Sequence, residues 1–303
     1  MRAGGVRSKW AYPLLLTPRS LRVRISIFAC LPQAGISDLS EVKMEIYVLV
    51  KQVPDPEAII KVKSDSELEI ENKYFTNFFD EIAIETGLKL KEKFSGKVTV
   101  LTVDNKKVDA LRRGIAMGAD DAIQITDPGL EGSDQFAIAK ALAAYLKDKP
   151  FDLILAGRQA MDDDAGIVGP AVAELLGIPH VNTIIGLEVD DPKKEVKVIR
   201  EVEGGKEILS CSLPALFTCQ KGLNNPRIPQ VMNVMKAMKA QIKKLDLAAL
   251  GLSAADAGGQ AAKIKIQKYL PPPKRPPVKM IKEGFPENVK ALVKLLKEEA
   301  KVI

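Results

Sequence analysis

The sequence predicts an α/β protein: a parallel sheet flanked by helices, with an antiparallel addition and an extended C-terminal arm. Short apolar runs alternate with amphipathic helical segments through most of the chain, which is the pattern of repeated βα units. The run FDLILA, Phe151–Ala156, is apolar after its second residue and suits a central parallel strand buried on both faces. The 303 residues, 46% of them hydrophobic and 28% charged, suffice for one large domain or two small ones.

The first half of the predicted domain follows a strand–helix order. Strands are expected where short apolar runs end at Pro, Gly or Asp, and helices where apolar side chains recur every three or four residues. Ser133 is the expected N-cap of the third helix. In chain order the predicted elements are strand Ile46–Val53, helix Asp80–Lys93, strand Lys97–Val103, helix Lys107–Met117, strand Ala122–Thr126, helix Asp134–Lys147, strand Phe151–Ala156 and helix Ile167–Leu176.

The next segments predict the antiparallel addition. Val181–Val189, Glu195–Val202 and Lys206–Ser212 have strand character, and Gly204-Gly205 between the last two is a hairpin-turn signal. Ala215–Cys219 is expected to return to the main sheet.

The composition changes at about Pro226. A methionine-rich basic helix, VMNVMKAMKAQIKK, precedes a small polar loop at Ser253–Gln260. Tyr269–Val278 contains PPPKRPP, an extended proline-rich segment, and Glu287–Val302 reads as a basic amphipathic helix. We expect this part to contribute little to the sheet core and to bind a partner chain.

The predicted organisation has three parts: a disordered leader at 1–43, a nucleotide-binding α/β domain at 44–224, and a partner-recognition segment with a C-terminal arm at 225–303. The leader contains several arginines and no acidic residue before Asp38. It is interpreted either as a transit peptide or as a start placed too far upstream, with Met44 as the true initiator. The upstream start is the favoured interpretation.

The charge and the rare residues exclude several function classes. The net charge is +6, but residues 1–43 hold seven basic and two acidic residues, so the rest of the chain is nearly neutral and no nucleic-acid partner is predicted. No apolar run reaches the ~18–20 residues of a membrane helix. Three scattered cysteines and one histidine argue against a zinc site, a disulfide framework and a His-based triad.

The segment GRQAMDDDAGIVGP, Gly157–Pro170, is the strongest candidate site because it directly follows the strand FDLILA. Ligands of open parallel sheets bind beyond the carboxyl ends of the strands. A loop entering a helix at Gly166–Gly169 offers backbone N–H groups to a phosphate, and Arg158 can neutralise its charge. Asp162–Asp164 either cap the helix and hold the loop or, as the less favoured alternative, bind a metal ion.

Other catalytic motifs are missing from the sequence. GxGxxG, GxxxxGK[ST] and GxSxG do not occur, so dehydrogenase, P-loop and esterase functions lose their main support. His180 is interpreted as a packed or surface side chain, and Cys211 and Cys219 as small core residues. No catalytic constellation is predicted.

Several segments together resemble the β subunit of electron transfer flavoprotein, and the resemblance covers essentially all of 44–303. Any one motif is weak, but their order and spacing are specific. The segments are VLVKQVPDP (Val48–Pro56), NFFDEIAIETGLKLKEK (Asn77–Lys93), RRGIAMGADDAIQITD (Arg112–Asp127), GRQAMDDDAGIVGP (Gly157–Pro170) and LPALFTCQKGLNNPRIPQVMNVMKA (Leu213–Ala237).

The resemblance implies a heterodimer with an α subunit, which holds most of an interface FAD. For this chain it implies a Rossmann-like parallel sheet of the adenine-nucleotide-binding type with a nucleotide pocket. That pocket is expected to hold AMP or a second FAD. Its implied residues are Leu49, Asn77, Phe78, Phe79, Asp80, Val103, Gly157, Arg158, Gln159, Ala160, Met161, Asp162, Asp163, Asp164, Ala165, Gly166, Ile167 and Val168.

The family's partner-recognition segment matches Asn225–Lys236, with Val231 at the position of its usual leucine anchor. Together with Met232 and Met235, Val231 would dock an acyl-CoA dehydrogenase-type flavoenzyme. The alternative is that Val231, Val234, Met235 and Met238 form one buried helical stripe.

Two departures bear on the nucleotide. The acidic loop ends in AGIVGP rather than the NxTGQ-like sequence of AMP-binding members, and KQVPDP leans the same way, although Pro56 replaces a frequent threonine. Both favour the members that hold a second FAD and split electron pairs from NADH between two acceptors.

The resemblance implies electron transport without catalytic side chains: electrons pass from a dehydrogenase of fatty acid β-oxidation, or from NADH, through FAD to a quinone-linked oxidoreductase. A cytoplasmic bacterial protein is expected, or a mitochondrial matrix protein if the leader is a transit peptide. The alternative function is a stand-alone adenine-nucleotide sensor of the same sheet architecture.

Overall fold

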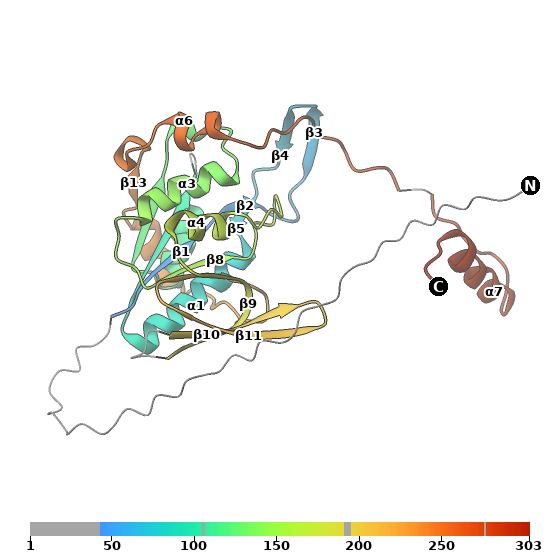
Figure 1. Cartoon of the computed structure of the whole chain (residues 1–303). Coiled ribbons are helices and arrows are strands. Elements are labelled where there is room, and N and C mark those ends of the chain that lie inside the picture. The colour runs from blue at the N-terminus through green and yellow to red at the C-terminus, as the bar shows by residue number, and fades with distance from the viewer. Residues whose placement is uncertain (1–42, 105–106, 191–194, 276) are drawn as a thin grey trace, which may run out of the picture. The chain divides into compact units, whose positions relative to one another are not determined.

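The computed structural model describes residues 43–104, 107–190, 195–275 and 277–303 (Figure 1). The predicted leader therefore lies outside the described residues, apart from Lys43. In the described part of the chain, no helix combines the length and the apolar character needed to cross a membrane.

A nine-stranded, mostly parallel sheet forms the centre of the body; the sequence predicts a parallel sheet with an antiparallel addition, but not its ninth strand, β13. The order of its strands is β11-β10-β9-β12-β8-β1-β6-β7-β13. In this order, every neighbouring pair from β9 through β12, β8, β1, β6 and β7 to β13 is parallel. At the other edge, β10 pairs antiparallel with both β9 and β11. The strands are β1 (Glu45–Leu49), β6 (Lys97–Val103), β7 (Asp121–Ile125), β8 (Leu153–Gly157), β9 (His180–Asp190), β10 (Glu195–Val202), β11 (Gly205–Ser212), β12 (Ala215–Cys219) and β13 (Lys243–Leu245).

The topology contains a switch point beside β1. The chain places β6 and then β7 on one side of β1, and later places β8 and β12 on the other. In parallel sheets of this kind the loops diverge at the switch point and leave a crevice at the carboxyl ends of the strands. The crevice is therefore expected between β1 and β8.

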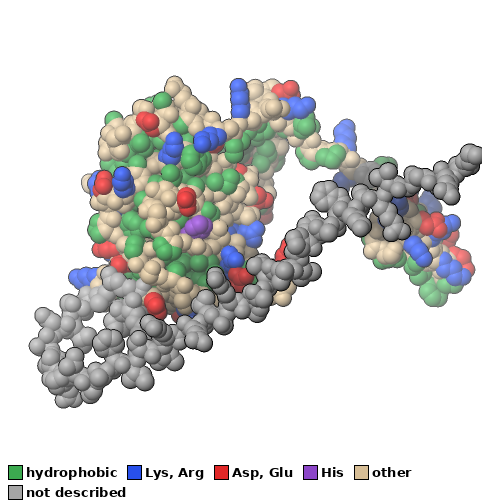
Figure 2. Space-filling view, in the orientation of Figure 1, with side chains coloured by type: hydrophobic (Ala, Val, Ile, Leu, Met, Phe, Trp, Pro, Cys, Tyr) green, Lys and Arg blue, Asp and Glu red, His purple; other side chains and the backbone are tan. Residues whose placement is uncertain are grey.

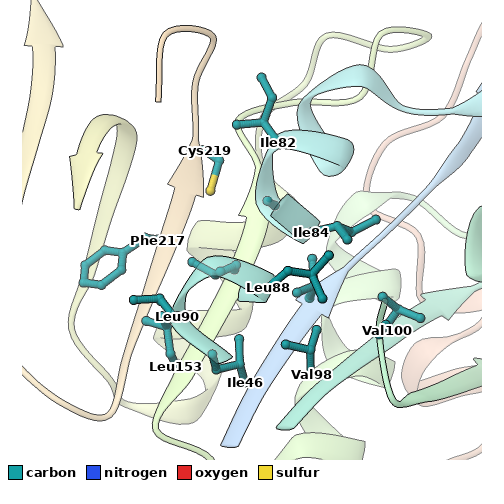
Figure 3. Packing of buried hydrophobic residues seen from close by; sticks show 14 of the residues in the cluster. Ile46, Ile82, Ile84, Leu88, Leu90, Val98, Val100, Leu153, Phe217 and Cys219 are labelled. Carbon is teal, nitrogen blue, oxygen red and sulfur yellow. The ribbon is translucent and has the colours of Figure 1, made fainter. Parts of the chain in front are cut away.

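Helices cover both faces of the sheet (Figure 1). On one face, α1 (Phe78–Phe94) and α2 (Asp109–Met117) pack on the inward side chains of the strands. Figure 3 shows this packing, in which Ile82, Ile84 and Leu88 of α1 meet strand residues such as Ile46. On the other face lie α3 (Gln135–Leu146) and α4 (Val168–Leu176).

Two local differences from the sequence predictions have simple causes. Asp134, not Ser133, caps α3, because its carboxylate accepts the Ala137 N–H at 2.8 Å. The segment after Pro226 does join the sheet, contrary to expectation: β13 pairs with β7, and the side chains of Leu247 and Ala257 are buried in the core beneath α3.

The remaining elements of the described chain are short. Two antiparallel pairs, β2 with β5 and β3 with β4, lie in the chain between β1 and α1. Their bounds and those of the remaining elements are β2 (Gln52–Pro54), β3 (Ile60–Ser64), β4 (Glu67–Ile70), β5 (Tyr74–Thr76), η1 (Pro128–Leu130), α5 (Val231–Lys239), η2 (Ala248–Leu250), α6 (Ala254–Ala257), η3 (Gly259–Ala261), α7 (Glu287–Lys294) and the π-helical turn η4 (Leu295–Glu299).

The visible surface of the body carries charges of both signs. In Figure 2, Lys and Arg side chains are interspersed with Asp and Glu and do not gather into one basic patch on the face shown. This distribution agrees with the near-neutral composition of the chain after the leader.

Candidate nucleotide site and partner helix

A cavity of about 110 Å³ lies at the switch point, at the carboxyl ends of β1, β6 and β8. Most of the residues predicted from the sequence line it. They are Leu49, Asn77, Asp80, Val103, Gly157, Arg158, Gln159, Ala160, Asp163, Ala165, Gly166, Ile167 and Val168.

The other five predicted residues do not line the cavity; four of them contact residues that do, and Phe78 contacts Phe79. The Phe79 ring lies under the Arg158 guanidinium at 5.3 Å and edge-on to Phe78. The Met161 N–H donates to Asn77. Asp162 pairs with Lys51, and Asp164 accepts the Gln159 amide.

Further lining residues were missed by sequence reasoning. Gln135, Ile138 and Leu142 line the cavity from α3, and Leu101 and Ala156 from the sheet. The three α3 residues are spaced three and four apart, so they share one helix face. That spacing is a sequence signal, but it does not say that this face of α3 overhangs the strand ends.

Asp80 connects three elements at the base of the cavity. Its carboxylate accepts the Lys51 N–H after β1 at 2.7 Å, the Gly157 N–H at the end of β8 at 3.1 Å, and the Asn77 amide at 2.8 Å. Gly157 must be a glycine here, because a Cβ would collide with the Asp80 carboxylate and Phe79. Burial raises the pKa of Asp80 to about 7, against the opposing effect of these hydrogen bonds.

Lys51 holds the acidic loop against the end of β1. Its ammonium lies 2.7 Å from Asp162 and 3.1 Å from Asp163. Desolvation opposes its charge, but these two carboxylates raise the pKa of Lys51 overall. Desolvation likewise opposes the charge of Asp163, yet hydrogen bonds from Gln135 and the Ala165 N–H, with the Lys51 charge, lower the Asp163 pKa.

The acidic triplet shapes the loop and does not cap α4. Asp163 accepts the Ala165 N–H at 3.1 Å, and Asp164, at φ 50°, accepts the Gln159 amide at 2.6 Å. Capping of α4 was the wrong part of the prediction, since α4 has no side-chain cap. Among the described residues, no three His, Cys, Asp or Glu side chains are grouped as metal ligands.

The cavity fits an adenine nucleotide in its chemistry. Leu49, Leu101, Ile138 and Leu142 provide apolar surface for a base. The uncapped N-terminus of α4 offers backbone N–H groups to a phosphate, and Gly166, at φ 61°, allows the preceding turn. Arg158 adds a positive charge, positioned by Gln159 at 2.8 Å and Gln220 at 3.2 Å.

The predicted partner helix is exposed. Val231, at the start of α5, is 76% exposed, and Met232, Met235 and Met238 are each more than half exposed. The alternative prediction of one buried apolar stripe is therefore wrong for the chain by itself. Among the nine residues of α5, only Ala237 is buried.

Known proteins with similar sequences decide the family. The electron transfer flavoprotein domain profile matches residues 69–250. An electron transfer flavoprotein subunit beta from Bacillus subtilis is 40% identical over 263 residues, 86% of this chain and all of the relative. The chain belongs to the electron transfer flavoprotein β-subunit family.

Two further relatives are similar over most of their length. A subunit beta from Megasphaera elsdenii is 39% identical over 242 residues, 77% of this chain and 89% of the relative. Subunit CarD of a caffeyl-CoA reductase–Etf complex from Acetobacterium woodii is 34% identical over 261 residues, 84% and 99% of the two chains. Family membership implies electron transfer, association with flavin and pairing with an α subunit.

Proposed function

We propose that this chain is the β subunit of a heterodimeric electron transfer flavoprotein that carries electrons from acyl-CoA dehydrogenase-type flavoenzymes, or from NADH, to a quinone-linked oxidoreductase. The observation that carries the proposal is the cavity at the switch point in a chain of this family. Its apolar lining residues and the uncapped N-terminus of α4 fit an adenine nucleotide. The residues of this chain bind and orient the nucleotide and dock the electron donor, and no side chain is assigned a bond-making role.

The nucleotide of this chain is proposed to lie in the cavity with its base against Leu49 and Ile138 and its phosphate at α4 and Arg158. When bound, a flavin supplies the one- and two-electron redox chemistry, and AMP would supply only structure. The α subunit is proposed to hold most of the interface FAD. Because the loop ends in AGIVGP, we favour a second FAD over AMP in the cavity.

The test is the nucleotide content of the chain purified as a complex with its α subunit. Two FAD per heterodimer support the second flavin and make the splitting of electron pairs from NADH the working mechanism. One FAD and one AMP overturn the second flavin but leave a single-carrier flavoprotein. A chain that forms no complex, binds no flavin and binds ATP instead would overturn the proposal in favour of the nucleotide sensor.

The exposed face of α5 is the proposed docking site for the electron donor. The relative from Acetobacterium woodii is named as part of a caffeyl-CoA reductase complex, which supports a partner that handles acyl-CoA compounds. Val231→Asp in the heterodimer is expected to raise the KM for a reduced acyl-CoA dehydrogenase about tenfold, because a buried interface anchor is replaced by a charge. The control is Ile208→Asp on β11, at another apolar position that is 63% exposed, against 76% for Val231.

The proposed location is the bacterial cytoplasm, with the mitochondrial matrix as the alternative if residues 1–43 act as a transit peptide. N-terminal sequencing of the protein purified from its own cells tests both. A protein that begins at Met44 supports the cytoplasmic location only if the transcript also begins too late to encode residues 1–43, because removal of a transit peptide would leave a similar N-terminus.

A further inference from the structure

The helix α5 is attached to the body with little apolar packing. Its one buried side chain is Ala237, near its C-terminal end. A helix of nine residues is marginal by itself, so other contacts must fix its position.

The first anchor is Arg227, four residues before α5. Its Nε and Nη2 atoms donate to the two carboxylate oxygens of Glu85 at 2.7 and 3.1 Å, and its backbone N–H donates to Glu85 at 3.2 Å. Nη1 donates to Glu92 at 2.6 Å. Both glutamates lie on α1, and Glu85 is only 3% exposed. Bidentate pairing with a buried carboxylate fixes direction as well as distance.

Asn224 attaches the same segment to α1 at a second point. Its side-chain amide donates to the Ile82 carbonyl at 3.1 Å and to the Thr86 hydroxyl at 2.7 Å. The chain that enters α5 is thus hydrogen-bonded along two turns of α1.

The second anchor is Arg112 of α2, at the opposite end of α5. Its Nη1 donates to the Ala237 carbonyl at 2.9 Å and also to the Met238 carbonyl. These are among the last carbonyl groups of α5, where the regular helical hydrogen bonds end; the Ala237 carbonyl also accepts the Ala240 N–H at 3.3 Å. A cation at this end also complements the helix dipole.

We propose that Arg227 and Arg112 are positioning residues for partner docking. They fix both ends of α5, so that the helix and its exposed apolar side chains are ordered before the donor flavoenzyme binds. The inference rests on the proposed docking function of α5. Ordering a surface segment before association removes part of the entropic cost of binding. Neither arginine needs to touch the partner.

The experiment uses the heterodimer with Arg227→Gln, Arg112→Gln and, as a matched control, Arg200→Gln, which removes an arginine–glutamate pair from the β10–β11 hairpin. The electron donor is an acyl-CoA dehydrogenase reduced by its acyl-CoA substrate. Each anchor variant is expected to raise the KM for the dehydrogenase about tenfold and change kcat less than about twofold. Hydrogen exchange of the α5 amides is expected to become about tenfold faster, while Arg200→Gln changes neither readout.

A second pair of variants covers the case in which Arg227→Gln does not fold because Glu85 is left buried and unpaired. Glu85→Gln with Arg227→Gln removes both charges and is expected to show the same KM and exchange changes. Arg227→Lys keeps the charge but loses the bidentate geometry, and it is expected to lie between wild type and Arg227→Gln.

The outcomes separate this inference from the docking function. If Val231→Asp raises the KM but the anchor variants match Arg200→Gln in KM and exchange, the positioning role is wrong. If the anchor variants accelerate exchange in α5 while Val231→Asp and the anchor variants all leave the KM unchanged, α5 is anchored as described but does not dock the donor. Both inferences are then overturned.

Discussion

The cavity and the partner helix are fixed in place by opposite means. The cavity is built on strand ends whose apolar side chains lie in the core, and the buried carboxylate of Asp80 connects β1, β8 and the start of α1. The helix α5 lies on the surface, and polar contacts from two arginines hold its ends. The proposed nucleotide site is thus part of the core, whereas the proposed docking helix keeps its apolar face outside it.

The largest expected effect tests the rigid side of this comparison. Gly157→Ala places a methyl group against Asp80 and Phe79, where there is no space for it. Overpacking there should reduce the free energy of unfolding by about 3 kcal/mol and release the nucleotide from the heterodimer. Urea denaturation and nucleotide content measure both. Gly205→Ala is the control, since nothing lies within 4 Å of the added carbon; equal effects of the two variants would contradict the argument.

Asp80 gives the stability of the protein a pH dependence that originates in the cavity. Burial raises its pKa to about 7 in the folded state, whereas the pKa of an Asp in an unfolded chain is about 3.9. The folded state therefore binds the proton more tightly, so this contribution to stability is fully present below about pH 4 and is lost as the pH rises through 7. Between pH 5 and 7 the loss is about 2 kcal/mol. Asp80→Asn should flatten the dependence measured by urea denaturation; an unchanged slope would contradict the assignment.

Sequence reasoning succeeded where one pattern decided the structure. FDLILA became the buried strand β8, and Gly204-Gly205 marked the hairpin between β10 and β11. It failed at β13, because the segment KKL has two exposed lysines and is a strand only through its pairing with β7. No local signal predicts that pairing.

The candidate site shows the same division. The loop Gly157–Val168 was found because it follows a strand and enters a helix. Lys51 was missed, although it lies within the first predicted strand, since its role depends on Asp162 and Asp163, more than a hundred residues away in the chain. Contacts between distant segments are set by the fold and not by spacing.

A smaller effect is expected at Lys51. Lys51→Met leaves Asp162 and Asp163 without their cation beside the proposed phosphate position, and it should raise the Kd of the nucleotide about tenfold. The change in the free energy of unfolding should stay below about 1 kcal/mol, because the pair is partly exposed. Lys97→Met is the matched control. It removes the ion pair between Lys97 and Asp121, at 2.5 Å, which lies at the amino end of β6, whereas the cavity lies at the carboxyl end of that strand. Isothermal titration calorimetry measures the two affinities, and a similar loss in both variants would exclude a local role of Lys51.

The smallest effect is expected at an arginine–glutamate pair that has the same length as the anchor of α5 but a much more exposed glutamate. Arg200 Nε lies 2.7 Å from Glu207, and Arg227 Nε lies 2.7 Å from Glu85. The side chain of Glu207 is 45% exposed and that of Glu85 is 5% exposed. Water can replace Arg200 at Glu207, so Arg200→Gln should change the free energy of unfolding by less than about 0.5 kcal/mol. Water cannot reach Glu85 in the same way, so Arg227→Gln should cost clearly more in the same urea titration. Equal costs would mean that distance, and not burial, determines what these arginines contribute, and the comparison between the cavity and α5 would then lose its physical basis.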